Sequence, residues 1–471
     1  MTSYRKAVAL ACLAFGVAVS GSASAQGTPP PAEAKKDAPQ AAPAKPTPVP
    51  DLQKLDSYLP FLYGPLDPVG MTAPSSRKGK THIVAATPAT TQWGYFDSSQ
   101  APVLRINPGD TVVMETMTGA HNQIVPGVTI EQVNKIRLDN PGRGPHTVTG
   151  PIYVEGAEPG DTLRIRINKI VPRSYASNLN LPGFAGLFPK EFPQGQIKYF
   201  YLDVKKMQME FAPGIVVPLR PFPGVLGVAR AEPGKFNTVQ PGRYAGNLDL
   251  RELTAGTALY VQVFQKGGLV WTGDSHAGQG NGEINLTAIE TAFQEFNVTI
   301  DLIKQRPLEW PRIETPTHWI TVGYDRDLNT ALDIMKAETV KFIVEHRKVS
   351  RDEAEKIMYE IWNCPIAEMV NITKGTYCMI PKNIKAAKPA PLPKQENAKF
   401  LVTYGKDADV DKAMQIASME MINTLEKKKG LPRLDAYSLA SIAMDCRIAP
   451  HRGGDKEVHC MTPKSLWTAS R

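Results

Sequence analysis

The sequence has few cysteines, no long apolar run beyond its first residues, and no large excess of either charge. Only five of its 471 residues are cysteine, which excludes a small scaffold held together by many disulfides. Beyond residue 25 no apolar stretch reaches the about 20 residues of a membrane helix, so we expect no membrane span in the mature chain. The 54 basic and 46 acidic residues are interspersed, so we expect no nucleic-acid partner.

The first residues have the order of a secretory signal. Arg5 and Lys6 precede the apolar run 7–19, and the small residues 23–25 follow. We therefore expect a signal peptide over residues 1–25 and an exported chain in the bacterial periplasm. Residues 26–51 are rich in proline and alanine, cannot bury a core, and are predicted to form a disordered tether.

Residues 52–310 have the pattern of a mainly β domain. Leu163, Ile165 and Ile167 alternate with polar residues, which is the period of a half-buried strand. Proline and glycine turns at 107–111 and 158–162 each precede such a strand. These features predict a β-sandwich-like N-terminal part.

The C-terminal third changes to helical spacing and predicts an α/β part that contains a duplicated helix-helix-strand unit. Leu328, Leu332 and Met335 recur at helical intervals, and Ser350 with Glu353 forms a capping box. Residues 318–324 resemble residues 399–405, and 377–382 resemble 458–464. We read a duplicated unit of about 65 to 70 residues. The predicted boundaries are repeat 1 at 311–384, a Pro-rich linker at 385–398 and repeat 2 at 399–471.

The cysteines support the duplication. Without Cys12 in the signal, four remain, and each repeat holds two that are fourteen positions apart. In an oxidising compartment this spacing predicts the disulfides Cys364–Cys378 and Cys446–Cys460. A zinc site is the weaker alternative, because each repeat would offer only two sulfurs.

The densest polar cluster is the glycine-rich stretch 272–283. Its side chains Asp274, His276 and Glu283 offer oxygen and nitrogen donors that could hold a metal ion and a water molecule. The alternative is a glycine loop in which Asp274 and His276 cap their own turns. Spacing alone does not separate the two readings.

Two further stretches carry candidate side chains. In residues 144–161, His146 and Glu155 flank a short strand. In residues 242–249, glycine and asparagine precede Asp249 and suggest a chain bent to present its carboxylate.

Together these stretches resemble the acetamidase/formamidase family. The resemblance lies in residues 150–161, 211–214, 221–229, 246–249, 273–276 and 279–283, and it extends over about residues 82–382. It implies a mainly β fold with an α/β C-terminal part. It also implies a metal-dependent hydrolase that converts short linear amides such as formamide or acetamide to ammonia and a carboxylate. A non-catalytic periplasmic protein that binds a small amide or carboxylate on the same scaffold is the alternative.

The resemblance also implies roles for particular residues. Asp249, Asp274 and His276 become the metal-ligand candidates, and Glu283, His146 and Glu155 the acid/base candidates. The expected cofactor is a divalent ion, zinc before calcium, the expected substrate is a small amide, and a homo-oligomer is expected. The sequence departs from the family pattern at Gly278, where alanine is usual, and at Asn281, where aspartate is expected.

Overall fold

The structure is a computed structural model that describes residues 79–181, 183–383 and 391–468. The predicted signal peptide (1–25), the tether (26–51), residues 52–78 of the β region and the first residues of the Pro-rich linker lie outside this part of the chain. Among the described residues, no helix combines the length and apolar character needed to cross a membrane.

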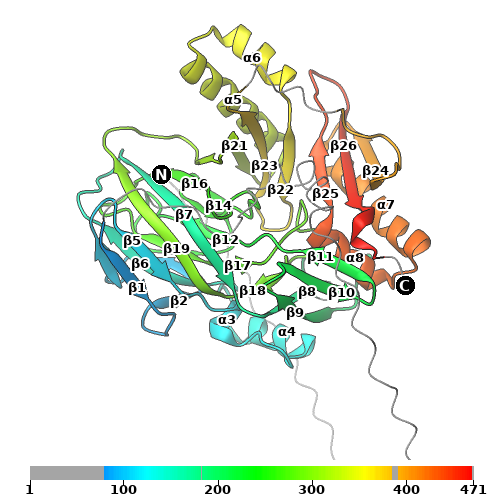
Figure 1. The fold of residues 1–471 in the computed structure, drawn as a ribbon, viewed down its shortest axis with the longest axis horizontal. Helices are drawn as coiled ribbons and strands as arrows, with labels where there is room; N and C mark the ends of the chain where they lie inside the picture. Colours follow the sequence, from blue (N-terminus) through cyan, green and yellow to red (C-terminus); the bar gives the residue numbers. More distant parts are fainter. Residues whose placement is uncertain (1–78, 182, 384–390, 469–471) are drawn as a thin grey trace, which may run out of the picture. The chain divides into compact units, whose positions relative to one another are not determined.

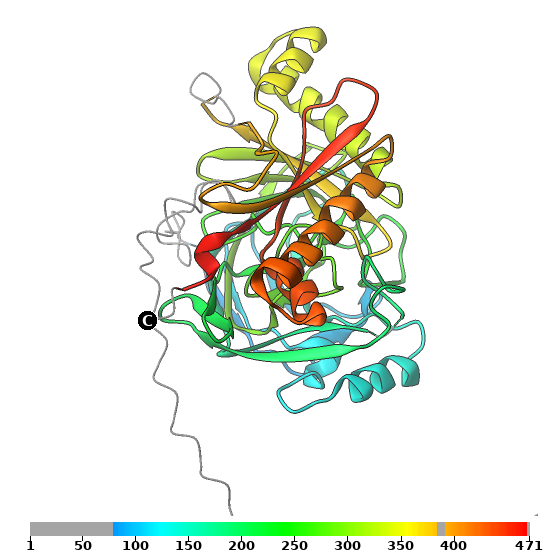
Figure 2. The ribbon, with the colours of Figure 1, turned by 90° about the vertical axis from the view of Figure 1, so that its right-hand side faces the viewer.

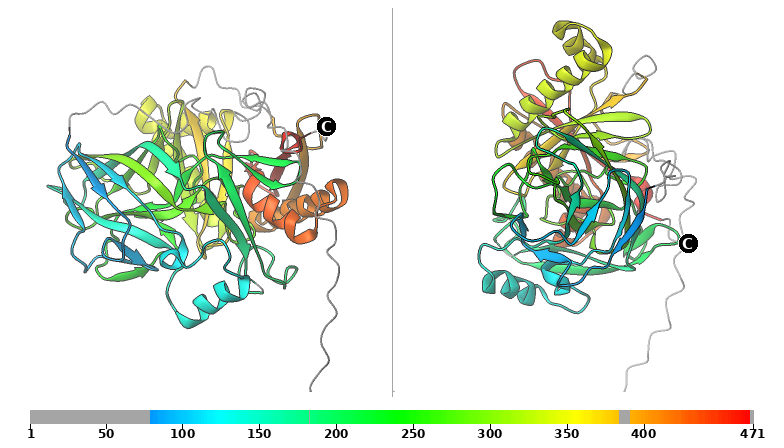
Figure 3. Two further views of the ribbon diagram at one scale, coloured as in Figure 1. Left: turned by 60° about the horizontal axis from the view of Figure 1, so that its bottom comes forward. Right: turned by 90° about the vertical axis from the view of Figure 1, so that its left-hand side faces the viewer.

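One large sheet runs from the N-terminal strands into the C-terminal units (Figures 1 and 3). Its strand order is β1-β5-β19-β7-β16-β20-β21-β23-β22-β25-β26-β24. The strands from the β region are β1 (Thr81–Val84), β5 (Thr111–Met114), β7 (Thr162–Pro172), β16 (Ala258–Gln262), β19 (Phe293–Ile303) and β20 (Arg312–Glu314).

The second sheet carries most of the polar stretches found in the sequence. Its main path is β11-β10-β9-β8-β18-β17-β12-β15-β14, and β6 pairs with β17, β2 and β4. The bounds are β2 (Thr91–Trp93), β4 (Leu104–Ile106), β6 (Thr147–Val154), β8 (Tyr175–Asn180), β9 (Gln196–Asp203), β10 (Gln208–Ala212), β11 (Ile215–Pro218), β12 (Phe222–Gly227), β14 (Pro241–Gly242), β15 (Ala245–Asn247), β17 (Val270–His276) and β18 (Glu290–Thr291). The remaining elements of this region are β3 (Tyr95–Asp97) paired with β13 (Lys235–Asn237), and the helices α3 (Gly119–Asn122) and α4 (Ile130–Asp139).

The predicted β periodicity is confirmed. Leu163, Ile165 and Ile167 are fully buried along β7, which pairs with β19 over nearly its whole length. The turns before β5 and β7 are closed by carboxylates: Asp110 accepts the backbone N–H of Asn107, and Asp161 accepts that of Glu158. The mainly β class of this region therefore follows from strand alternation and turn chemistry.

The C-terminal third contains the same unit twice. Repeat 1 consists of β21 (His318–Asp325), α5 (Leu328–Arg347), α6 (Arg351–Glu360), β22 (Cys364–Glu368) and β23 (Lys374–Pro381). Repeat 2 consists of β24 (Phe400–Asp407), α7 (Val410–Lys429), α8 (Arg433–Ala443), β25 (Asp445–Ile448) and β26 (Lys456–Pro463), followed by the short helix η2 (Lys464–Leu466). Figure 2 shows α7 lying across β24 and β26. The α/β part with a duplicated unit is confirmed.

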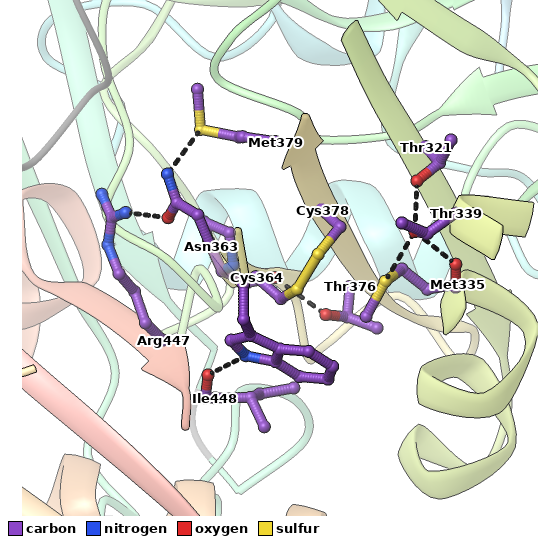
Figure 4. Close-up of a disulfide and its surroundings, with 12 residues drawn as sticks. Thr321, Met335, Thr339, Asn363, Cys364, Thr376, Cys378, Met379, Arg447 and Ile448 are labelled. Atoms are coloured by element: carbon purple, nitrogen blue, oxygen red, sulfur yellow. Dashed lines mark hydrogen bonds between the residues drawn. A yellow bond between two sulfur atoms is a disulfide. The ribbon is translucent and has the colours of Figure 1, made fainter. Parts of the chain in front are cut away.

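The two repeats meet through equivalent strands. β22 of repeat 1 pairs antiparallel with β25 of repeat 2, so the two units are related by a local twofold arrangement within one sheet. The predicted disulfides Cys364–Cys378 and Cys446–Cys460 are both present, and this pairing leaves no sulfur for the alternative zinc site. Figure 4 shows the first disulfide beside a contact between the repeats, from Arg447 to Asn363. Trp362 makes a second such contact, to the carbonyl of Ile448.

The repeats share a hydrophobic core with the β region. One cluster of buried residues joins α5 to α8 with the strands β8 to β11, through side chains such as Phe200, Phe211 and Tyr437. The predicted boundaries at 310 and 384–399 mark where the fold changes type, and as domain boundaries they remain a prediction.

Candidate functional site

The candidate site lies where the second sheet meets both repeats. Asp274 and His276 are at the end of β17, and Glu290 on β18 is the direct strand partner of His276. Asp249 follows β15, and Glu283 lies in the loop between β17 and β18. The long loops after these strands bring together side chains that are scattered over more than forty residues of sequence.

His276 is at the centre of the cluster and is fully buried. Its Nε2 lies 3.4 Å from Asp274 Oδ2, 3.4 Å from Glu290 Oε1 and 3.9 Å from Glu283 Oε1. Its Nδ1 lies 3.8 Å from Asp249 Oδ1. Two sets of three donors, Asp249 with Asp274 and His276, and His276 with Glu283 and Glu290, have ligand atoms within 4.8 Å of one another.

The backbone is bent to present these carboxylates. Asp249, Asp274 and Glu283 have φ angles of 45°, 49° and 50°, in the left-handed region that non-glycine residues seldom adopt. Such strain persists where the surrounding structure imposes it, and it concentrates at functional sites. The bent presentation predicted for Asp249 agrees with this geometry.

Gly224 on β12 keeps the centre of the cluster open. A Cβ atom at this position would lie 2.5 Å from Asp274 Oδ2 and 2.7 Å from Asp249 Oδ1. Any side chain here would occupy the space between the carboxylates, so the sequence needs glycine at 224.

Burial and crowding of like charges shift the pKa values of the cluster. Burial and the neighbouring Asp274 raise the pKa of Asp249 well above its usual range, and burial with Asp249 does the same for Glu283. Burial opposes ionisation of Asp274, but His146 and His276 lower its pKa to about 2. Burial likewise opposes protonation of His276, yet Glu290 and Asp274 raise its pKa well above the usual value. The cluster holds more carboxyl groups than imidazoles, and a bound cation would favour ionisation of these carboxyl groups.

The donor atoms fit a divalent cation. Among the described residues, Asp249 Oδ1 and both ring nitrogens of His276 are buried without a hydrogen-bond partner. Two donors that share a zinc ion lie about 3.3 to 3.6 Å apart when each is about 2.0 to 2.2 Å from it. The separations of 3.4 to 3.9 Å around His276 are close to that range and are long for hydrogen bonds. The residues present therefore suit an ion held by carboxylate oxygens and one imidazole.

The accessible side of the cluster is formed by His146 and Glu290. Their side chains are 12% and 23% exposed, against 0% for His276 and 1% for Asp249. His146 Nε2 lies 3.6 Å from Asp274 Oδ1, while its Nδ1 is buried without a partner in the described structure. These two side chains are the ones of the cluster that a ligand reaches first, and the burial of the others favours a small ligand.

The structure brings five of the six predicted site residues together and leaves one outside. Asp249, Asp274, His276, Glu283 and His146 form the cluster. Glu155 lies just beyond the end of β6, is 42% exposed, and is paired with Arg105 at 2.7 Å. Strand alternation and this surface ion pair place Glu155 outside the cluster, so we do not assign it an acid/base role.

Three contributing residues were missed in the sequence. Glu290 contacts His276 directly. Glu368 at the end of β22 is fully buried and accepts the backbone N–H groups of Val370 and Asn371. Asn371 in turn donates to Asp249 Oδ2. Burial raises the pKa of Glu368 to about 8, although the hydrogen bonds from Val370 and Asn371 act to lower it. The sequence signal for Glu368 was a single glutamate at the end of an otherwise apolar strand.

Asn281 does not face the cluster. Its amide NH2 donates to the carbonyl of Ile366 in repeat 1, and its Oδ1 accepts the N–H of Cys446 in repeat 2. An ionised aspartate has no N–H to donate to Ile366, so asparagine suits this position. The departure at 281 therefore concerns the contact with the repeats and gives no reason to expect weaker cation binding.

Comparison with known proteins places these observations in one family. The model of the acetamidase/formamidase family matches residues 95–236 and 229–451. An acetamidase of Mycolicibacterium smegmatis is 27% identical over 218 residues, covering 34% of this chain and 54% of that protein. A formamidase of Methylophilus methylotrophus is 26% identical over 282 residues, covering 46% of this chain and 67% of that protein.

A solved structure agrees with these sequence matches. The crystal structure of an acetamidase from Yersinia enterocolitica matches with a TM-score of 0.60 and 26% identity, and the match covers 67% of this chain and 96% of that one. The chain spans about half to two thirds of the length of these two curated relatives. The family match covers most of the sequence and includes every residue of the cluster, as the resemblance predicted, and the chain belongs to the acetamidase/formamidase family.

Proposed function

We propose that this protein is a metal-dependent amidase that hydrolyses short linear amides, such as formamide or acetamide, to ammonia and a carboxylate. The observation that carries the proposal is the buried His276 among carboxylates with unpaired donor atoms around Gly224, in a chain of this family. The names of the relatives, acetamidase and formamidase, support the choice of substrate.

A divalent ion would be held by Asp249, Asp274 and His276, and in that place it would polarise the amide carbonyl and acidify a water molecule. The imidazole favours zinc, whereas calcium prefers oxygen donors only.

The chain's own residues supply the proton transfers. Hydrolysis adds the oxygen of water to the carbonyl carbon, breaks the carbon–nitrogen bond, and must deliver a proton to the leaving nitrogen. Glu283 can take a proton from the attacking water on Oε1 and pass it to the nitrogen, because this oxygen lies beside the proposed ligand set, 3.9 Å from His276 Nε2. His146 at the open side is placed to orient the amide by hydrogen bonding.

Ammonia release from formamide, acetamide and propionamide tests the proposal directly. We expect turnover that falls with substrate length, because the cluster is accessible only past His146 and Glu290. A Glu283→Gln variant keeps the size of the side chain and should lower kcat by about 10² to 10⁴-fold. Folded, metal-replete protein that releases no ammonia from any of the three would contradict the proposal and favour a binding protein.

We further propose an exported, homo-oligomeric protein. The signal-like residues 1–25 and the two disulfides support export, because such bonds persist in oxidising compartments. Periplasmic fractionation with N-terminal sequencing should find a chain that begins at Gln26. Light scattering of the mature protein should give a mass above that of one chain, and a monomer would contradict the expected assembly.

A further inference from the structure

The loop that carries Glu283 is bound on nearly every residue by the C-terminal repeats. Gly280 N–H donates to the carbonyl of Ser441, and Asn281 N–H donates to that of Met444, both in repeat 2. Gly282 N–H donates to the carbonyl of Ala367 in repeat 1, and Met369 N–H donates back to Gly282. Backbone hydrogen bonds therefore tie this loop to both repeats.

Two hydroxyl groups of α8 hold the loop on the other side of Glu283. Tyr437 donates to the carbonyl of Ile284 at 2.6 Å. Ser441 accepts the N–H of Asn285 at 3.1 Å and donates to the carbonyl of Thr287 at 2.9 Å. Both side chains are buried, at 1% and 0% exposure, so water cannot replace these bonds.

The fit between α8 and the loop is tight. A Cβ atom at Gly280 would lie 2.7 Å from the carbonyl oxygen of Ser441 and 2.8 Å from that of Ala440. Tyr437 is itself fixed, because its ring stacks on Phe192 with centroids 4.0 Å apart and its oxygen accepts the N–H of Phe188. Helix α8 therefore fixes the position of the backbone next to Glu283.

The left-handed conformation of Glu283 needs such support. Its φ of 50° is a strained conformation for a residue other than glycine, and it persists only where surrounding contacts impose it. The contacts on either side of Glu283 come from residues of both repeats. Helix α8 contacts Ile284, Asn285 and Thr287, which also receive hydrogen bonds from Leu187 and Asn178 of the β region.

We propose that repeat 2 is part of the catalytic apparatus, with Tyr437 and Ser441 as positioning residues that hold Glu283 in its reactive place. The inference rests on the proposed function, in which Glu283 transfers the protons. Neither residue touches the substrate or the cluster around His276. They act through the backbone of residues 284–287.

The test compares Tyr437→Phe, Ser441→Ala and the double variant in the full mature chain. Phenylalanine keeps the ring that stacks on Phe192 and removes only the hydroxyl. Each single variant should lower kcat for acetamide about 10-fold while KM changes less than about threefold, because misplacement of a catalytic group costs rate more than ground-state binding. Ser441→Thr, which keeps the hydroxyl, should restore kcat relative to Ser441→Val, which has nearly the same size.

Tyr359→Phe is the matched control. Tyr359 is on α6, the equivalent helix of repeat 1, and its hydroxyl donates to the carbonyl of His451, away from the Glu283 loop. Its variant should keep the wild-type kcat.

Hydrogen exchange of the peptide 279–287 reads the position of the loop without reference to activity. We expect its amides to exchange about 10-fold faster in Tyr437→Phe and Ser441→Ala than in wild type, and Tyr359→Phe to leave them unchanged. If the wild type shows no turnover and the two variants still exchange faster, the proposed function is refuted and the positioning of the loop by α8 is supported. Unchanged exchange, or a wild-type kcat in the double variant, would overturn the inference.

Discussion

The two repeats have the same fold and meet the site in different ways. Repeat 1 reaches the cluster with the turn between β22 and β23, where Glu368 orders the backbone and Asn371 binds Asp249. Repeat 2 exposes the turn between β25 and β26 to solvent, and it contacts the loop of Glu283 with α8 and with Cys446 at the start of β25. A duplicated unit can therefore support one site through two different elements, one for the metal-ligand side and one for the proton-transfer side.

The helices show this division in their sequences. In α6 only Ala354 and Met358 are buried, and most of the remaining side chains are charged. In α8 every residue from Ala436 to Ala443 is buried. The apolar character of α8 is what a helix needs when it is covered on several sides.

Removing either disulfide should have the largest effect on stability. Each bond closes a loop of the same length, with a sequence separation of 14. The pairs of substitutions Cys364→Ser with Cys378→Ser, and Cys446→Ser with Cys460→Ser, should each lower the free energy of unfolding by about 2 to 4 kcal/mol. Urea unfolding measures both. A large loss in one repeat and none in the other would contradict the equivalence of the two hairpins.

Gly280→Ala should disrupt the contact between α8 of repeat 2 and the Glu283 loop. Its Cβ would meet backbone atoms of α8, which cannot rotate away, so we expect a loss of about 1 to 3 kcal/mol in unfolding free energy. Gly278→Ala is the matched control, because its Cβ would lie 3.2 Å from the flexible end of Ile289. Equal melting behaviour of the two variants would show that the contact between the loop and α8 is loose.

Asn371→Ala tests the contribution of repeat 1. Without its amide, Asp249 loses the hydrogen bond that orients its carboxylate, and we expect metal affinity to fall about 10- to 100-fold. Equilibrium dialysis with zinc measures the change. Asn134→Ala on α4, which bonds only to Arg137 among the described residues, should bind the metal as wild type does. An unchanged affinity in Asn371→Ala would remove repeat 1 from the metal-binding role.

The smallest expected effect concerns a position where the repeats differ. His318 in β21 corresponds by strand pairing to Phe400 in β24, one position away from the match of residues 318–324 with 399–405. Burial, with Arg447 and Lys382 nearby, lowers the pKa of His318 to about 4 from 6.5. Because the unfolded chain binds the proton first, wild-type stability should fall as pH drops from about 6.5 to 4.

His318→Phe removes this contribution and should flatten the difference in unfolding free energy between pH 7 and pH 4.5. Chemical denaturation of the wild type and of His318→Phe at both pH values measures it. The same pH dependence in His318→Phe as in wild type would contradict the assignment of this stability change to His318.

The sequence was sufficient to predict those features that depend on neighbouring residues. Alternation in β7, the helix spacing of α5 and the Ser350 cap, which accepts the N–H of Glu353, are all decided by near neighbours. Asp274 and His276 could be found because they share one glycine-rich stretch. The disulfides followed from equal spacing in two copies.

The missing parts of the site depend on distant contacts. Asn371 reaches Asp249 across 122 positions, and Tyr437 reaches Ile284 across 153, so no local pattern pairs them. Glu155 lies apart from the cluster because a motif residue next to a strand end can point outward, here to Arg105. The contacts of Asn281 could not be predicted because its partners, Ile366 and Cys446, belong to two different repeats.

The most direct test of the account is to measure metal content and ammonia release on the same samples of mature protein, before and after chelation and after return of zinc, with Asp249→Asn alongside. We predict that metal and turnover are lost together on chelation, that both return with zinc, and that Asp249→Asn regains neither. Full turnover by metal-free protein, or by Asp249→Asn, would contradict the assignment of this cluster as a metal-dependent amidase site.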